Sequence, residues 1–189
     1  MPSYTDVMDT PLVYKRYFGA ETTPIETVRP TVWNATIGPP DTDQNRATVL
    51  EQYKLYVEMA DRISARRSLT NTFFLTLNTA VFASIGALWK NRPVAPSWLL
   101  VFPLVALVVQ CAAWFFLVRS YRQLNAAKYI VIGVLEERLP ASPYWKAEWK
   151  ALGEGKDKAK YWPMTHLEQW IPVIFAATYL AAFIAAVTY

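Results

Sequence analysis

The chain of 189 residues is long enough for one domain, and its apolar residues (53%) gather in three uncharged blocks. The net charge of +4 comes from basic residues mixed with acidic ones, which excludes the basic stripe expected of a nucleic-acid-binding protein. The single cysteine, Cys111, excludes an intrachain disulfide and a cysteine-based zinc site. Eight Trp and eleven Tyr favour contact with a membrane–water boundary, where these side chains are enriched.

Residues 1–42 combine six prolines with several large aromatic side chains. Proline fixes φ and removes a backbone donor, so regular helix is not expected across this stretch. Disordered tails are poor in aromatic residues, so a tail without contacts is not expected either. The pattern predicts a proline-rich, extended N-terminal arm that packs on its own subunit or on a neighbouring one.

A helix is predicted to begin at Thr42 or Asp43, because either residue can cap its first turn, and to run into the uncharged block 69–89. A short loop with two prolines separates this block from the second one, 98–118. Since about 20 helical residues cross the hydrocarbon of a bilayer, each block predicts a membrane span. Both helices extend beyond their blocks. The sequence therefore predicts a long antiparallel helical hairpin over 43–139, whose polar part forms a stalk outside the membrane.

Lys128 interrupts the apolar seam of the predicted stalk. Antiparallel pairing from the ends of the two blocks gives partner numbers that add up to about 188. This register places Lys128 near Asp61 and Glu58, and opposite charges at such a distance form ion pairs. We therefore predict a stalk ion pair between Lys128 and one of these two carboxylates.

The segment 140–169 is polar and aromatic, and Ser142-Pro143 is a favourable helix start. The short helix that follows fits two interpretations equally well: an amphipathic interfacial helix lying on anionic lipid, or a helix packed on the stalk. The uncharged block 170–189 predicts a third, C-terminal span. The tryptophans of these regions are the predicted interfacial anchors: Trp98, Trp145, Trp149, Trp162 and Trp170.

Basic residues are distributed unevenly between the predicted spans. Eight precede the first span, two lie between the first and the second, and nine lie between the second and the third. Cytoplasmic segments of membrane proteins carry the excess of Lys and Arg. The sequence thus predicts an all-α protein of the bacterial inner membrane, with the N-terminus and residues 119–169 in the cytoplasm and the C-terminus on the far side.

No catalytic, metal or cofactor motif is recognisable in the sequence. The chain has one histidine, His166, and it lacks the glycine-rich loops that bind nucleotide phosphates. The predicted spans contain no Asp, Glu, Lys, Arg or His, the residues that coupled transporters place at mid-membrane. We therefore expect no enzymatic reaction and no cofactor.

The first predicted span nevertheless has a polar side of amide and hydroxyl residues: Asn71, Thr72, Thr76, Asn78 and Thr79. Small and hydroxyl residues let helices pack closely in a membrane. The same residues around the axis of an oligomer would line a wetted pore. Helix packing is the favoured interpretation, and a pore lining is the alternative.

Two stretches, YKLYVEMADRISARRSLTNTFF and RSYRQLNAAKYIVIGVLEERLPASPYWKAEW, resemble the RipA-like octameric membrane protein family, as does the hydrophobic hairpin between them. The similarity covers residues from about 45 to 185. It implies a ring-like homo-oligomer, with eight copies as the family name states, and no known reaction. The family's namesake is a cytoplasmic-membrane protein that an intracellular bacterium needs to proliferate in host cells. The layout is also similar to small membrane effectors of bacterial defence systems, the SLATT type, which permeabilise membranes.

These observations lead to one main expectation. The chain is expected to be a homo-oligomeric inner-membrane scaffold without catalytic activity, whose partners are the lipid bilayer and further copies of itself. An oligomeric channel or membrane-permeabilising effector is the alternative, and an enzyme acting on lipid comes third.

Overall fold

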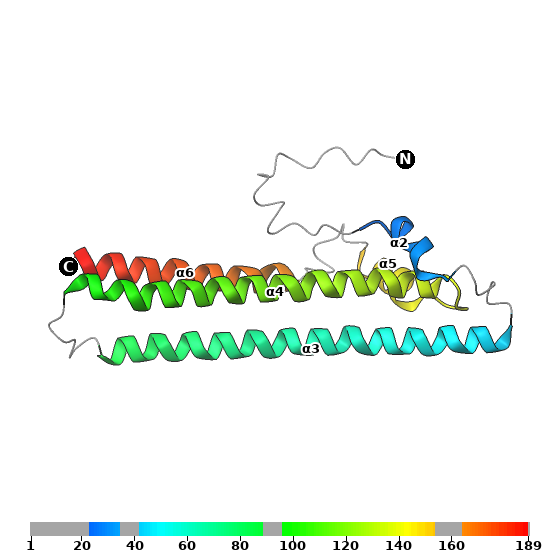
Figure 1. Cartoon of the computed structure of the whole chain (residues 1–189), viewed down its shortest axis with the longest axis horizontal. Coiled ribbons are helices and arrows are strands. Elements are labelled where there is room, and N and C mark those ends of the chain that lie inside the picture. Colours follow the sequence, from blue (N-terminus) through cyan, green and yellow to red (C-terminus); the bar gives the residue numbers. More distant parts are fainter. Residues whose placement is uncertain (1–22, 35–41, 89–95, 154–163, 189) are drawn as a thin grey trace, which may run out of the picture.

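The computed structural model describes residues 23–34, 42–88, 96–153 and 164–188, and every element in these ranges is helical. Two long helices form the body of the molecule: α3, Asp43–Leu88, and α4, Val101–Glu136. The 3₁₀ turn η2, Ser97–Leu100, leads into α4. The helices α3 and α4 lie side by side and antiparallel, and α6, Met164–Thr188, packs along the first half of α4 (Figure 1).

Local signals explain where the long helices begin and end. The hydroxyl oxygen of Thr42 accepts a hydrogen bond from the Asn45 N–H at 3.3 Å, and α3 starts at Asp43, one of the two predicted start residues. The helix then runs for 46 residues, about 69 Å at 1.5 Å per residue, because no proline interrupts it. The end of α4 at Glu136 comes just before Pro140, which cannot continue a helix.

The register between α3 and α4 is defined by side-chain hydrogen bonds that cross between them. The numbers of Asn71 and Trp114 add up to 185 and those of Met59 and Lys128 to 187, and in the other three pairs they add up to 189, close to the sum of about 188 expected from the sequence. The pairs are spread over most of the contact, so the two helices keep one register throughout. The three pairs with a sum of 189 are Tyr53 with Glu136, Ser64 with Asn125, and Asn78 with Cys111.

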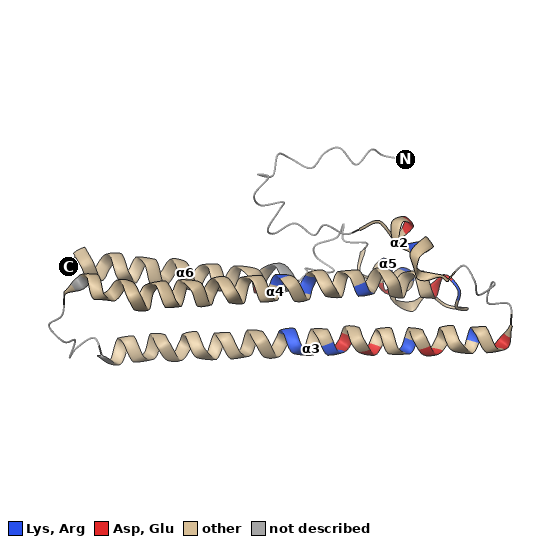
Figure 2. Ribbon diagram, in the orientation of Figure 1, with Lys and Arg blue, Asp and Glu red and all other residues tan. Residues whose placement is uncertain are grey.

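Charge divides the described structure into two ends. Figure 2 shows Lys, Arg, Asp and Glu along one part of the molecule, whereas the other part lacks them in α3, α4 and α6 alike. We call residues 68–88, 98–118 and 169–188 the charge-free end, and the remaining described residues the charged end. The buried apolar core is divided in the same way. The charged end buries Val49, Ala60, Ile63, Ile130, Ile132, Val134 and Leu135, and the charge-free end buries Cys111, Trp114, Val118 and Tyr179.

Two helical segments among the described residues are long and apolar enough to cross a membrane: Trp98–Glu136 and Leu167–Thr188. The part of α3 that the sequence predicts as the first span, within 69–89, is not one of these two segments. The amides and hydroxyls of α3 explain the difference, because Asn71, Asn78 and several threonines lower the mean hydropathy of its charge-free end.

A short helix lies where the sequence predicts an extended arm. Helix α2, Ile25–Val32, packs on the charged end of α4. Pro24 precedes its first turn, and Pro30 sits near its end, where its missing N–H deprives the helix of one backbone hydrogen bond. The prediction of extended chain was therefore wrong for these eight residues, and most of the predicted arm lies outside the described residues.

The chain turns back along α4 after Glu136. The π-helical turn η3, Pro143–Glu148, and the α-helical turn α5, Trp149–Ala151, form one continuous short helix on the charged end. Gly153, with φ of 78°, ends it in the left-handed conformation that glycine adopts without strain. This segment packs on the stalk, as one of the two interpretations of the sequence held.

Candidate functional site

Glu136 is the central polar residue of the charged end. Its side chain is 2% exposed, and its carboxylate accepts four hydrogen bonds. The Tyr53 hydroxyl donates from α3 at 3.1 Å, and burial together with this bond raises the pKa of Tyr53, which stays a donor. The other donors are the Ser142 hydroxyl at 2.6 Å and the N–H groups of Tyr144 and Trp145, both at 3.0 Å. One buried carboxylate thus joins α3, α4 and η3.

This arrangement changes the role that the sequence gave to Ser142. The sequence predicts that the Ser142 oxygen caps the helix that follows. In the structure the Ser142 hydroxyl donates to Glu136, and the Glu136 carboxylate accepts the N–H groups of the first helical turn. The cap therefore comes from a residue six positions earlier, where an anion also suits the positive end of the helix dipole.

Trp145 packs directly on the backbone of Gly133 in α4. A Cβ atom built on Gly133 would lie 2.7 and 2.8 Å from carbons of the Trp145 ring, closer than atoms can approach. Glycine at position 133 is therefore what allows the indole to lie against the helix. The sequence contains no signal for this contact, because it depends on the turn that brings residues 142–152 back along α4.

Helix α2 is held on α4 by one ion pair and one ring contact. Arg29 Nε and Nη2 donate to the two carboxylate oxygens of Glu137 at 2.8 and 2.7 Å. These hydrogen bonds hold the pKa of Glu137 below its usual value. The guanidinium carbon of Arg138 lies 3.4 Å from the centroid of the Trp33 ring, a cation–π contact.

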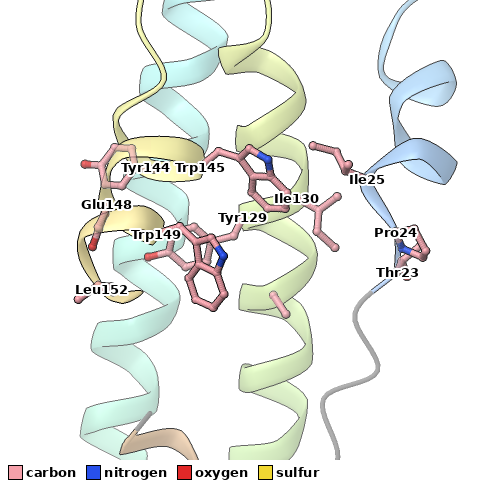
Figure 3. A pocket seen from close by; sticks show the side chains of 11 residues that line it. Thr23, Pro24, Ile25, Tyr129, Ile130, Tyr144, Trp145, Glu148, Trp149 and Leu152 are labelled. Atoms are coloured by element: carbon pink, nitrogen blue, oxygen red, sulfur yellow. The ribbon is translucent and has the colours of Figure 1, made fainter. Parts of the chain in front are cut away.

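An apolar pocket of about 590 Å³ opens between α2, α4 and the η3–α5 segment. In Figure 3 the side chains of Trp145 and Trp149 reach from η3–α5 toward the space between α4 and α2, and Ile25 faces them from α2. Tyr129 and Trp149 are 40% and 49% exposed, so the pocket presents aromatic surface to the outside. Its lining consists of Thr23, Pro24, Ile25, Ala126, Tyr129, Ile130, Tyr144, Trp145, Glu148, Trp149 and Leu152.

The pocket is suited to bind apolar groups. Its walls are mainly aromatic and aliphatic, and Glu148 is the charged residue among those that line it. Within the described ranges, no three His, Cys, Asp or Glu side chains gather into a metal site. The pocket is therefore the candidate functional site of this chain, and the sequence analysis did not find it.

The predicted stalk ion pair is wrong. Lys128 reaches α3 at the expected height, but its Nζ lies 5.1 Å from the centroid of the Tyr56 ring and 4.0 Å from the Met59 sulfur. Glu58 pairs instead with Arg62 of its own helix at 2.6 Å, and Asp61 is exposed. The predicted register of α3 against α4 is close to the observed one, but the sequence could not show which side of α3 faces Lys128.

The two asparagines of the predicted polar side bind side chains of other helices in the same chain. Asn71 Oδ1 accepts the Trp114 indole N–H at 2.8 Å. Asn78 is completely buried, and its Oδ1 accepts the Tyr179 hydroxyl of α6 at 2.8 Å. These hydrogen bonds connect three helices at the charge-free end.

The threonines of the same predicted set lie on the outside of the chain. Thr72, Thr76 and Thr79 are exposed, and the Thr72 hydroxyl donates to the carbonyl of Ser68 at 3.0 Å. Thr76 and Thr79 line a shallow hollow with Leu75, Ala80 and Ala83. The predicted polar side thus separates into two amides that bind other helices of the chain and three exposed threonines.

The predicted tryptophan anchors also separate. Trp98 is 62% exposed where the charge-free part of α4 begins, and Trp170 is 39% exposed near the start of the charge-free part of α6. Trp145 packs instead on Gly133, fourteen residues and about 21 Å beyond Arg119 along α4, and Trp149 lines the pocket. Trp162 lies outside the described residues.

The comparisons with known proteins agree with the architecture. The chain matches no curated protein and no solved structure. Residues 50–188 match a family that is described as the octameric membrane protein family, and this match covers α3 from residue 50 onward and all of α4, η3, α5 and α6. The match extends over well more than half of the sequence, and the two segments long and apolar enough to span a bilayer lie within it. The chain therefore belongs to the octameric membrane protein family (8xMP).

Proposed function

We propose that the protein is a homo-oligomeric scaffold of the bacterial inner membrane, without catalytic activity, whose charged ends project into the cytoplasm. The observation that supports this proposal most directly is the separation in Figure 2, where all three long helices lack charge over the same end. A bilayer excludes charged side chains from its hydrocarbon, so this end matches the membrane and the other end matches water.

The neighbours of the charge-free end of α3 support the proposal that this end also lies in the membrane. Asn71 and Asn78 of α3 contact Trp114 and Cys111 of α4, so the two charge-free ends lie at one depth. Leu69 and Phe73 are 71% and 60% exposed in the single chain, and lipid or a neighbouring copy would cover them. Three spans per chain follow from this placement, although α3 is less apolar than the other two.

The sidedness of the proposal rests on Lys and Arg. Arg66 and Arg67 end the charged part of α3, and Arg119 and Arg122 begin that of α4. Excess basic charge at the border of a span marks the cytoplasmic side. The charged end with its pocket then faces the cytoplasm, and the C-terminus faces the opposite side.

A scaffold fits the described polar groups better than a channel does. The amides of half-buried Asn71 and buried Asn78 bind side chains within the chain and are not available to line a lumen. The alternative, an oligomeric channel or permeabilising effector, is supported by the exposed threonines of α3, which would face the axis of a ring.

Native mass spectrometry and ion flux into liposomes test the two functions together. The scaffold predicts an octamer in detergent that carries no current above that of empty liposomes. A current in the wild type that Thr76→Leu with Thr79→Leu abolishes would establish the channel, and Leu69→Ala serves as the matched control on α3. A wild-type protein that stays monomeric in detergent would contradict both functions.

Reporter fusions test the sidedness. A reporter that works only in the cytoplasm should be inactive when it is fused after Tyr189 and active when it is fused before Met1. The reverse pattern would overturn the proposed orientation and leave the oligomer untouched.

A further inference from the structure

We infer that the aromatic pocket receives Leu55 and Met59 from helix α3 of a neighbouring copy, so that the charged ends join into a closed ring. This inference deepens the proposed function and rests on it. It assigns the pocket one occupant, a second copy of this chain, and it names the two surfaces that meet.

The first surface is an exposed apolar ridge on α3. Leu55 and Met59 are 57% and 44% exposed, and their spacing of four residues places them next to each other on one side of the helix. They lie at the charged end, where the proposed solvent is water rather than lipid. A pair of large apolar side chains exposed side by side in water marks a surface that another molecule covers.

The second surface is the pocket itself, which is a hollow with apolar walls. Two tryptophans, Trp145 and Trp149, form one wall, and Ile25 and Ile130 face them (Figure 3). Aliphatic side chains that enter between these rings would replace water with aromatic contact. The ridge is convex and apolar, and the pocket is concave and apolar, so the two surfaces are complementary in shape.

The ridge and the pocket lie at the same height along the molecule. The sulfur of Met59 lies 4.0 Å from Lys128 Nζ, and Lys128 stands between the pocket residues Ala126 and Ile130. Leu55 follows one turn farther from the charge-free end. A ring whose axis runs along the helices moves each copy around the axis without changing its height. Surfaces that meet in such a ring must therefore share a height, and these two do.

The two surfaces also lie on opposite sides of the subunit. The pocket lies where α2 flanks α4, and α2 is on the side of α4 away from α3 (Figure 1). The ridge lies on α3, whose buried side faces α4 through Ala60 and Ile63. A cyclic oligomer uses two different, complementary patches on opposite sides of each copy, because every subunit contacts two neighbours. The family to which the chain belongs is octameric, which supplies the closed ring that this geometry needs.

Charge at the edges of the two surfaces is complementary. Arg66 follows Met59 at helical spacing on the ridge side of α3, and Arg62 on the same side is paired with Glu58. The charged residue that lines the pocket is Glu148, which is exposed. Basic side chains beside the ridge would thus meet an acidic rim at the pocket, which favours this orientation of one copy on the next.

Disulfide cross-linking between two differently tagged copies tests the inference. Both copies carry Cys111→Ala, which removes the single native thiol; one adds Leu55→Cys and the other Ile25→Cys. We expect this mixture to form the mixed disulfide at least ten-fold more than a matched control with Asp61→Cys in place of Leu55→Cys. Asp61 is exposed about 3 Å beyond the ridge residue Met59 along α3 but on another side of the helix.

Each outcome decides one point. A chain that carries Leu55→Cys and Ile25→Cys together should give a ladder of cross-linked species that ends at the octamer. Equal yields from the test and control pairs, or a higher yield with Asp61→Cys, would overturn the proposed contact. Native mass spectrometry of the untreated wild type separates the two levels: an octamer without the cross-link refutes this inference alone, whereas a monomer refutes the proposed function.

Discussion

The two ends of the α3–α4 pair share one register but are held together by different contacts. At the charged end, Ala60 and Ile63 of α3 and Ile132 and Leu135 of α4 are buried apolar residues, and the carboxylate of Glu136 joins α3, α4 and η3. At the charge-free end, the Oδ1 atoms of Asn71 and Asn78 accept hydrogen bonds from Trp114 and Tyr179, and these bonds cross between helices that are apolar on the outside as well.

The proposed solvent around each end decides which contact stabilises the helix pair there. In water, burial of apolar side chains drives helices together, and a buried carboxylate is tolerated because four donors surround it. In lipid, apolar side chains gain little by leaving the solvent, so close packing and polar contacts hold the helices. The same pair of helices thus changes its means of association at the border between its ends.

The largest effect is expected from Glu136→Ala at the charged end. The substitution leaves the N–H groups of Tyr144 and Trp145 and two hydroxyls without their acceptor. We therefore expect the free energy of unfolding in detergent to fall by about 3 kcal/mol. Hydrogen exchange at Tyr144 and Trp145 checks the location of the loss. The neighbouring Glu137→Ala is the control, because it removes a half-exposed pair and leaves these amides protected. Unchanged exchange in Glu136→Ala would contradict the role assigned to the carboxylate.

A second substitution tests the close packing of Trp145 on Gly133. Gly133→Ala places a methyl group into the Trp145 ring, and overpacking of this kind costs about 2 kcal/mol. Gly86→Ala is the matched control at the charge-free end, because nothing lies within 4 Å of the added atom and alanine favours helix. Denaturant unfolding followed by circular dichroism should show a lower midpoint for the first variant and an equal or higher one for the second.

A smaller effect is expected from Asn78→Leu at the charge-free end. Hydrogen bonds between helices in lipid contribute about 1 kcal/mol, since the separated helices find other partners. A double-mutant cycle with Tyr179→Phe isolates the contribution of the bond between Asn78 Oδ1 and the Tyr179 hydroxyl. If the changes in the free energy of unfolding from the two substitutions are additive, this bond does not couple α3 to α6.

The smallest effect is expected for the docking of α2 at acidic pH. Because Arg29 holds the pKa of Glu137 below its usual value of 4.5, the ion pair stabilises the docked α2 fully above that value. This contribution disappears as the pH falls through the lowered pKa and Glu137 becomes protonated. Hydrogen exchange within Ile25–Val32 should therefore accelerate, after correction for intrinsic rates, between pH 5 and the acid limit of the folded protein. Arg29→Gln should remove this pH dependence.

Local patterns in the sequence were sufficient for the elements whose limits are set by neighbouring residues. The start of α3 follows from the cap at Thr42, and Ser142-Pro143 marks where η3 begins. The register followed from the lengths of the uncharged blocks, because a short loop leaves little freedom in how the two helices pair.

The remaining features depend on contacts between distant parts of the chain. Glu136 caps η3 and Gly133 accommodates Trp145 because the chain turns back along α4, which no local pattern announces. The pocket needs α2, α4 and η3–α5 together. The sequence does not predict helix α2 itself, because the prolines of this stretch argue against a helix. Lys128 failed as an ion-pair partner because height alone does not fix the side of a helix that a long side chain reaches.

The continuity of α3 across the border between its ends has a mechanical consequence. Residues 43–67 extend about 37 Å beyond the charge-free end without a break, so they behave as a stiff lever arm. A tilt of 5° in the bilayer, of the kind that a change in membrane thickness produces, would shift the tip of this arm by about 3 Å. In the proposed octamer, eight such arms held at their sides would turn a small change in lipid geometry into a change in diameter at the rim of the charged ends.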